Sequence, residues 1–185
     1  MQNHSSYSDW ADYDNFSPDI TVEGSDSKLL PAYLSLIRLS DSAIQNLISY
    51  FEAQEEPTII VFFGDHQPAD SVVRPVWKLN GKDDADLTDE EEALRYKVPF
   101  FIWANFNIET ENDLEISANY LAAKTLDAAG LPKSAYDNFL SQLRTEVPVI
   151  SANHVTLSDG TFTTASKQKD LLYDYQTLQY YLLFD

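Results

Sequence analysis

Two continuous apolar runs constrain the fold more than any other feature of this sequence. Residues 58–63 and 98–103 are rich in β-branched and aromatic side chains and show no alternation of polar and apolar positions. A strand buried on both faces of an α/β sheet has this composition, and Pro99 favours an edge position or the start of a strand. We therefore predict an α/β fold, with a mixed, mostly parallel sheet flanked by helices.

Helical patterns surround these runs. Apolar residues recur at spacings of three, four and seven from Pro31 to Phe51, which predicts a helix opened by proline in its first turn. Asp41 interrupts that apolar stripe, and we expect it to face inward or to lie at the edge of the stripe. The closing residues 169–184 predict an aromatic amphipathic helix that packs on the sheet.

Shorter elements are expected between and after the two runs. Thr88 with Glu91, and Asn112 with Glu115, have the spacing of a capping box at a helix start, and Gly130 would close the second of these helices. A further helix is predicted over residues 135–143, a short strand over 146–150, and a turn at 159–160. Residues 1–28 show no sustained period and are expected to be irregular.

The charge balance excludes several functions. The chain has 185 residues, with 30 acidic against 12 basic, for a net charge of −18, yet 44% of its residues are hydrophobic. That apolar fraction favours a globular domain over disorder. The scarcity of basic residues excludes a duplex nucleic-acid partner and a polybasic lipid-binding face.

An acidic segment accounts for part of this charge. Residues 83–92 hold seven carboxylates. A solvated loop with a helix N-terminus is the simpler interpretation, because the alternating ligands and central glycine of an EF-hand calcium loop are missing.

The sequence also lacks cysteine and any apolar run long enough to cross a membrane. There is no cysteine, which removes disulfides, thiolate metal sites and cysteine nucleophiles. No apolar run approaches the roughly 20 residues that span a bilayer, and the polar first residues do not resemble a signal peptide. We expect any export or anchoring signal to lie outside this sequence.

The most informative pair is Asp65 and His66, directly after the first apolar run. A carboxylate oxygen and an imidazole nitrogen together suit a divalent metal, and Gly64 would let the backbone turn so that both side chains converge. The same three residues also occur as an ordinary turn, so both interpretations stay open on the residues alone. His4 lies in a polar segment typical of a loop, and His154 lies in an expected loop with no partner pattern, which indicates a structural role.

Several segments together resemble one family. The order of residues 1–4, 33–48, 60–68 and 98–103, and the closing residues 175–184, resemble the later part of the sulfatase-type domain of lipoteichoic acid synthase and related phosphoglycerol transferases, in the alkaline phosphatase superfamily. The resemblance covers nearly the whole chain. Tyr181 stands where this family usually has Asp, and Asp185 where it usually has Gly.

The resemblance implies a metal-dependent mechanism. In this family a manganese or magnesium ion is held by an upstream Glu, the nucleophilic Thr and an adjacent Asp-His pair, which Asp65 and His66 match. His4 matches a histidine that contacts the phosphate or glycerol of the substrate. The implied substrate is a glycerophosphate-containing lipid or polymer of the cell envelope, handled at the extracellular face of a bacterial membrane by a longer, membrane-anchored protein.

The nucleophilic Thr and the metal-binding Glu lie upstream of the Asn-His segment in this family. We therefore expect residues 1–185 to be the C-terminal portion of a single catalytic domain, with an incompletely liganded metal and no turnover by themselves. Two alternatives stay open: a non-catalytic truncated remnant that acts as a binding module, and a phosphoethanolamine transferase or true sulfatase.

Overall fold

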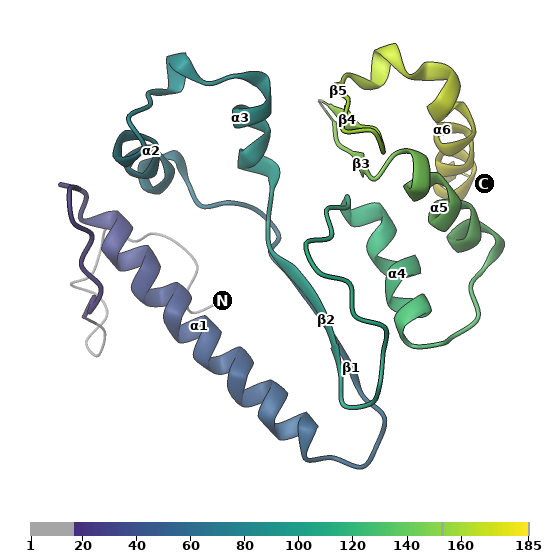
Figure 1. The fold of residues 1–185 in the computed structure, drawn as a ribbon, viewed down its shortest axis with the longest axis horizontal. Helices are drawn as coiled ribbons and strands as arrows, with labels where there is room; N and C mark the ends of the chain where they lie inside the picture. Colours follow the sequence, from purple (N-terminus) through teal and green to yellow (C-terminus); the bar gives the residue numbers. More distant parts are fainter. Residues whose placement is uncertain (1–16, 153, 185) are drawn as a thin grey trace. The chain divides into compact units, whose positions relative to one another are not determined.

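The computed structural model describes residues 17–152 and 154–184, and it divides into two compact units (Figure 1). The first unit comprises residues 1–58 and 62–100, and the second comprises residues 59–61 and 101–185. The division falls within two paired strands, β1 (Ile59–Phe63) and β2 (Phe100–Ala104). Helices and strands both occur, which confirms the predicted α/β class.

The first unit contains the long helix α1 (Leu29–Glu52), as the apolar stripe predicted. This helix contacts α2 (Asp70–Leu79). A small core is formed by the buried residues Leu30, Ala32 and Leu36 of α1 together with Val72 of α2. The buried Ser35 hydroxyl donates to the Pro31 carbonyl and accepts from the amides of residues 19 and 20, which holds the irregular segment 17–28 against the helix. The C-terminal half of α1 is mostly exposed, and Asp41 is exposed with it.

The acidic segment folds as a loop with a helix start, as its simpler interpretation predicted. Thr88 and Glu91 form both bonds of a capping box at the start of α3 (Asp89–Ala93), which follows the 3₁₀ turn η2 (Asp84–Asp86). Asp84 pairs with Arg74 at 2.6 Å, and Glu91 pairs with Lys82. These carboxylates therefore cap a helix and bind side-chain cations of the same unit.

The predicted burial of the two apolar runs on both faces is wrong for this structure. β1 and β2 are half-buried along their length, and the Phe63 side chain at the end of β1 is 55% exposed. Among the described strands they pair only with each other, so no third described strand continues this sheet.

The second unit has its own core. It contains α4 (Leu121–Ala128), α5 (Ala135–Glu146), α6 (Lys169–Phe184) and the strands β3 (Val149–Ile150), β4 (Val155–Thr156) and β5 (Phe162–Thr163). Its buried cluster is made by Tyr120, Ala123, Leu140, Leu143, Val147, Val155, Leu172 and Tyr175. The Tyr120 hydroxyl donates to the Val147 carbonyl at 2.7 Å, which satisfies its polar end within this core.

The predicted helix cap at Asn112 is wrong. The chain has a positive φ of 57° at Asp113, and helical structure begins only at the 3₁₀ turn η4 (Ala118–Tyr120), which leads into α4. Ser117 explains the late start, because its amide donates to the Pro148 carbonyl and its hydroxyl accepts from the Ile150 amide. These contacts draw the preceding residues towards β3 and out of a helix. Gly130, with a φ of 65°, closes α4 as predicted.

The small sheet of the second unit has the order β3-β4-β5 and is antiparallel throughout. The expected mostly parallel arrangement does not hold here, because the connections are only a few residues long and a parallel pair needs a crossover of about a dozen. Gly160 closes the predicted turn between β4 and β5 with a φ of 84°. The 3₁₀ turn η5 (Ala165–Lys167) precedes α6, whose Leu172 and Tyr175 are buried while Leu178 and Leu182 are exposed.

Candidate metal centre

The Asp65–His66 pair lies in the loop that follows β1, and both side chains are exposed. Asp65 Oδ2 lies 3.7 Å from His66 Nε2, and the side chains are 80% and 62% exposed, respectively. Asp65 Oδ1 accepts a hydrogen bond of 2.9 Å from the His66 amide, which fixes the carboxylate against its own backbone. The two donor atoms expected from the sequence therefore converge.

The backbone also determines which nitrogen of the His66 imidazole carries the hydrogen. His66 Nδ1 lies 2.8 Å from the Gln67 carbonyl oxygen, and because a carbonyl can only accept, Nδ1 carries the hydrogen of this bond. In the neutral ring Nε2 then holds the lone pair, and Nε2 lies 3.7 Å from the carboxylate oxygen Oδ2 of Asp65. Two such acceptors attract each other only through a proton or a cation between them. Metal-bound histidines in proteins are oriented in this way by their second ring nitrogen.

The residues present fit a divalent ion. Ligand bonds of about 2.1 Å can join two donor atoms up to about 4.2 Å apart, so a separation of 3.7 Å lets Asp65 and His66 share one ion. No group of three or more His, Asp or Glu residues with metal-binding geometry occurs in the described ranges. Within them, the pair offers two ligands.

The loop that carries the pair is attached to residues 95–99. The Gly64 amide donates to the Pro99 carbonyl at 3.0 Å, and the Gln67 side-chain amide donates to the Lys97 carbonyl. Arg95, in the 3₁₀ turn η3 (Leu94–Tyr96), donates from Nη1 to the Pro68 carbonyl at 3.1 Å and from Nη2 to Asp70 at 2.7 Å. No sequence pattern indicates a role for Arg95, because its partners lie 25 and 27 residues earlier in the chain.

The other histidines have different positions. His4 lies outside the described residues. His154 is buried, its Nδ1 lies 2.9 Å from the Ser151 hydroxyl, and its ring stacks on Phe162 with the centroids 4.7 Å apart. Burial lowers the pKa of His154, and the charge of Glu115 opposes this effect. These contacts agree with the structural role expected for His154.

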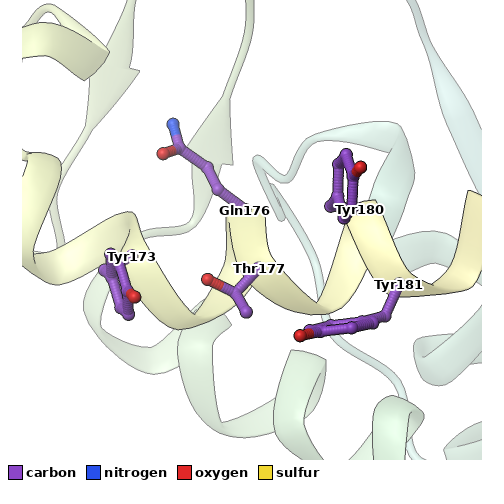
Figure 2. Close-up of a pocket in the computed structure, with 5 residues that line it drawn as sticks. All are labelled: Tyr173, Gln176, Thr177, Tyr180 and Tyr181. Atoms are coloured by element: carbon purple, nitrogen blue, oxygen red, sulfur yellow. The ribbon is translucent and has the colours of Figure 1, made fainter. Parts of the chain in front are cut away.

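A pocket on α6 has no metal-binding character. It is lined by Tyr173, Gln176, Thr177, Tyr180 and Tyr181, all from one helix (Figure 2). In Figure 2, Tyr173, Thr177 and Tyr181 lie along one side of α6, and Gln176 and Tyr180 along the other. Its lining offers hydroxyl, amide and aromatic groups without a carboxylate or an imidazole, so the candidate centre remains the loop after β1.

Comparison with known proteins gives the family of this chain and agrees with its fold. The pattern of the sulfatase family matches residues 1–131, and the chain belongs to this family. The solved phosphoglycerol transferase GacH of Streptococcus pyogenes, in complex with sn-glycerol-1-phosphate, superposes with a TM-score of 0.54 at 20% identity over 83% of this chain. This likeness confirms an alkaline-phosphatase-like fold. A protein of Rhizobium meliloti (strain 1021), whose name refers to cyclic beta-1,2-glucan modification, is 24% identical over 176 residues, or 89% of this chain.

Both relatives are much longer than the matched region. The chain covers 37% of the GacH chain and 27% of the Rhizobium protein. No helix in residues 17–152 or 154–184 has the length and apolar character to cross a membrane.

Proposed function

We propose that this chain supplies the Asp-His part of a metal site in a sulfatase-type domain that transfers phosphoglycerol from a lipid or polymer donor. The observation that carries the proposal is the 3.7 Å separation of Asp65 Oδ2 and His66 Nε2 in an exposed loop, which is short enough for both to bind one ion. Membership in the sulfatase family supports it, and the family resemblance stated above suggests Mn²⁺ or Mg²⁺ as the ion. The relatives' names suggest a glycan acceptor, because one is a phosphoglycerol transferase and the other is named for glucan modification.

The residues of this chain would act by holding the two metal-binding side chains in the right orientation. The Gln67 carbonyl keeps the proton on His66 Nδ1, so that Nε2 can bind the ion, and the His66 amide orients the Asp65 carboxylate. A bound divalent ion would act as a Lewis acid on the phosphoryl group. His4 would contact the phosphate or glycerol of the substrate. An upstream Thr and Glu of the same domain would supply the nucleophile and the remaining protein ligand, at the extracellular face of the membrane.

The test is phosphoglycerol transfer in cells that carry the gene at its native locus. The isolated envelope glycans should gain phosphoglycerol units by mass spectrometry, and both His66→Ala and Asp65→Asn should abolish this gain. Asp86→Asn is the matched control, because it removes a carboxylate of the acidic segment and should leave transfer unchanged. Full transfer with His66→Ala would contradict the site.

A second candidate, hydrolysis of sulfate esters, follows from the family description. The same cells would then release sulfate from an aryl sulfate in a His66-dependent manner, with no change in glycan phosphoglycerol. A binding module without turnover would give neither signal.

A further inference from the structure

The loop after β1 depends on a side chain from a distant part of the sequence. Asp65 and His66 are largely exposed, so packing contributes little to their positions, and the path of the backbone from 64 to 70 determines where they point. One end of this path is fixed by the bond from the Gly64 amide to Pro99. The other end enters α2 through Pro68, which is buried, and Asp70.

Arg95 holds this second end in two places at once. Its guanidinium donates to the Pro68 carbonyl at 3.1 Å and to the Asp70 carboxylate at 2.7 Å, so it joins the end of the loop to the first turn of α2. Its side chain is only 26% exposed. The Asp70 carboxylate is 59% exposed, so this ion pair contributes little by itself, but the bond to the Pro68 carbonyl is partly buried, and the planar fork of arginine fits two acceptors where an ammonium group does not.

We infer that Arg95 is a positioning residue, which sets the approach of Asp65 to His66 for a divalent ion by holding the Pro68 carbonyl and Asp70 together. The inference rests on the metal role proposed above. Arg95 lies in η3 and bonds to Pro68 and Asp70, so its effect on the two ligands is transmitted by the backbone of residues 65–68.

Arg74 provides a matched control. It also pairs with Asp70, at 3.7 Å, and with Asp84 at 2.6 Å, and its side chain is 58% exposed. Arg74→Gln therefore removes one positive charge beside the same carboxylate but leaves the bond to the Pro68 carbonyl intact. Arg95→Gln removes both the charge and that bond, and Arg95→Lys keeps the charge while it can reach only one of the two acceptors at a time.

The first measurement needs no metal. In amide spectra of the ¹⁵N-labelled 185-residue chain, Arg95→Gln should shift the signals of residues 64–67, Arg95→Lys should shift them less, and Arg74→Gln should leave them in place. Shifts of equal size in Arg95→Gln and Arg74→Gln, or none in Arg95→Gln, would overturn the inference. If Arg95→Gln does not fold, the comparison of Arg95→Lys with Arg74→Gln decides in the same way.

The second measurement adds Mn²⁺, whose paramagnetism broadens nearby signals even when binding is weak. The wild-type chain should lose the signals of Asp65 and His66 first, Arg95→Gln should need about tenfold more Mn²⁺, and Arg74→Gln should match the wild type within about twofold. An unchanged Mn²⁺ dependence in Arg95→Gln would contradict the inference. Absence of broadening in the wild type would instead count against the proposed metal role, and the metal-free spectra would still decide whether Arg95 positions the loop.

Discussion

The surroundings of His154 favour its neutral form. It is buried beside β4, with the Ser151 hydroxyl on Nδ1 and the Phe162 ring against its face. Burial lowers its pKa from the ordinary value of 6.5, so the folded chain resists protonation there. In the unfolded chain the same imidazole takes up a proton near pH 6.5.

This difference predicts a pH dependence of stability. Below pH 6.5 the unfolded state binds more protons than the folded state. The free energy of unfolding of the second unit should therefore decrease as the pH is lowered from 6.5 to the folded pKa of His154. Asp159, whose pKa is lowered by hydrogen bonds from Thr161, adds a loss of the same sign at more acidic pH, below its ordinary value of 3.8. Urea unfolding followed at the Val155 amide should show the first loss in the wild type and in His66→Gln, but not in His154→Gln.

Gly64 is a second residue with a specific constraint. A Cβ built there would lie 3.0 Å from Val98 Cβ and 3.3 Å from Val98 Cγ1, closer than ordinary van der Waals contact. Gly64→Ala should therefore push the loop away from residues 98–99, lower the free energy of unfolding by about 1–3 kcal/mol, and shift the amide signals of Asp65 and His66.

Gly81→Ala is the matched control for this change. Its Cβ would have no atom within 4 Å, but its φ of 71° makes alanine strained by about 1–2 kcal/mol. It should lower stability without moving the signals of Asp65 and His66. A Gly64→Ala protein with wild-type stability and spectrum would contradict the close contact.

Among the elements, α5 shows how a local cap supports a core. The Ser134 hydroxyl accepts from the Asp137 amide at 3.1 Å, and the Asp137 carboxylate accepts from the Ser134 amide at 3.1 Å. The helix that begins there carries Leu140 and Leu143 into the core of the second unit. Ser134→Ala should reduce the free energy of unfolding by about 1 kcal/mol, measured by denaturant, whereas Ser134→Thr should retain most of it.

Comparison of the elements shows which features the sequence could predict and which it could not. The cap at Thr88 and the helix predicted over 135–143, which the structure extends to 146, depend on residues three or four apart, so their patterns were sufficient. The Asn112 pattern failed because Ser117 bonds to residues 148 and 150, more than 30 residues later, and these contacts override a local cap. For the same reason the Asp65–His66 pair was visible as neighbours after a strand, but Arg95 was not.

At the scale of the whole molecule, apolar surface remains exposed on several elements. Phe63 in β1, Tyr50 in α1 and Leu183 in α6 are 55%, 61% and 75% exposed, respectively. Residues 180–184 at the end of α6 are all exposed and follow one another in the chain, and contiguous exposed apolar residues are typical of surfaces that another protein segment covers. This pattern supports the proposal that the chain works within a larger sulfatase-type domain.

The same proposal predicts weak metal binding by the 185-residue chain alone. Two protein ligands hold a divalent ion less tightly than a complete set, so calorimetric titration with Mn²⁺ should show no tight site, and an assay with a glycerophosphate donor should show no turnover. A single tight site that Asp65→Ala removes would contradict the expectation of an incomplete ligand set.

The central claim is that Asp65 and His66 bind one divalent ion together, and anomalous X-ray scattering tests it most directly. Crystals of the chain soaked at a high Mn²⁺ concentration should show an anomalous peak at bonding distance, about 2.0–2.2 Å, from both Asp65 Oδ2 and His66 Nε2. The peak should disappear in His66→Ala. An anomalous peak confined to the carboxylates of residues 83–92, with none at Asp65 and His66, would contradict the account.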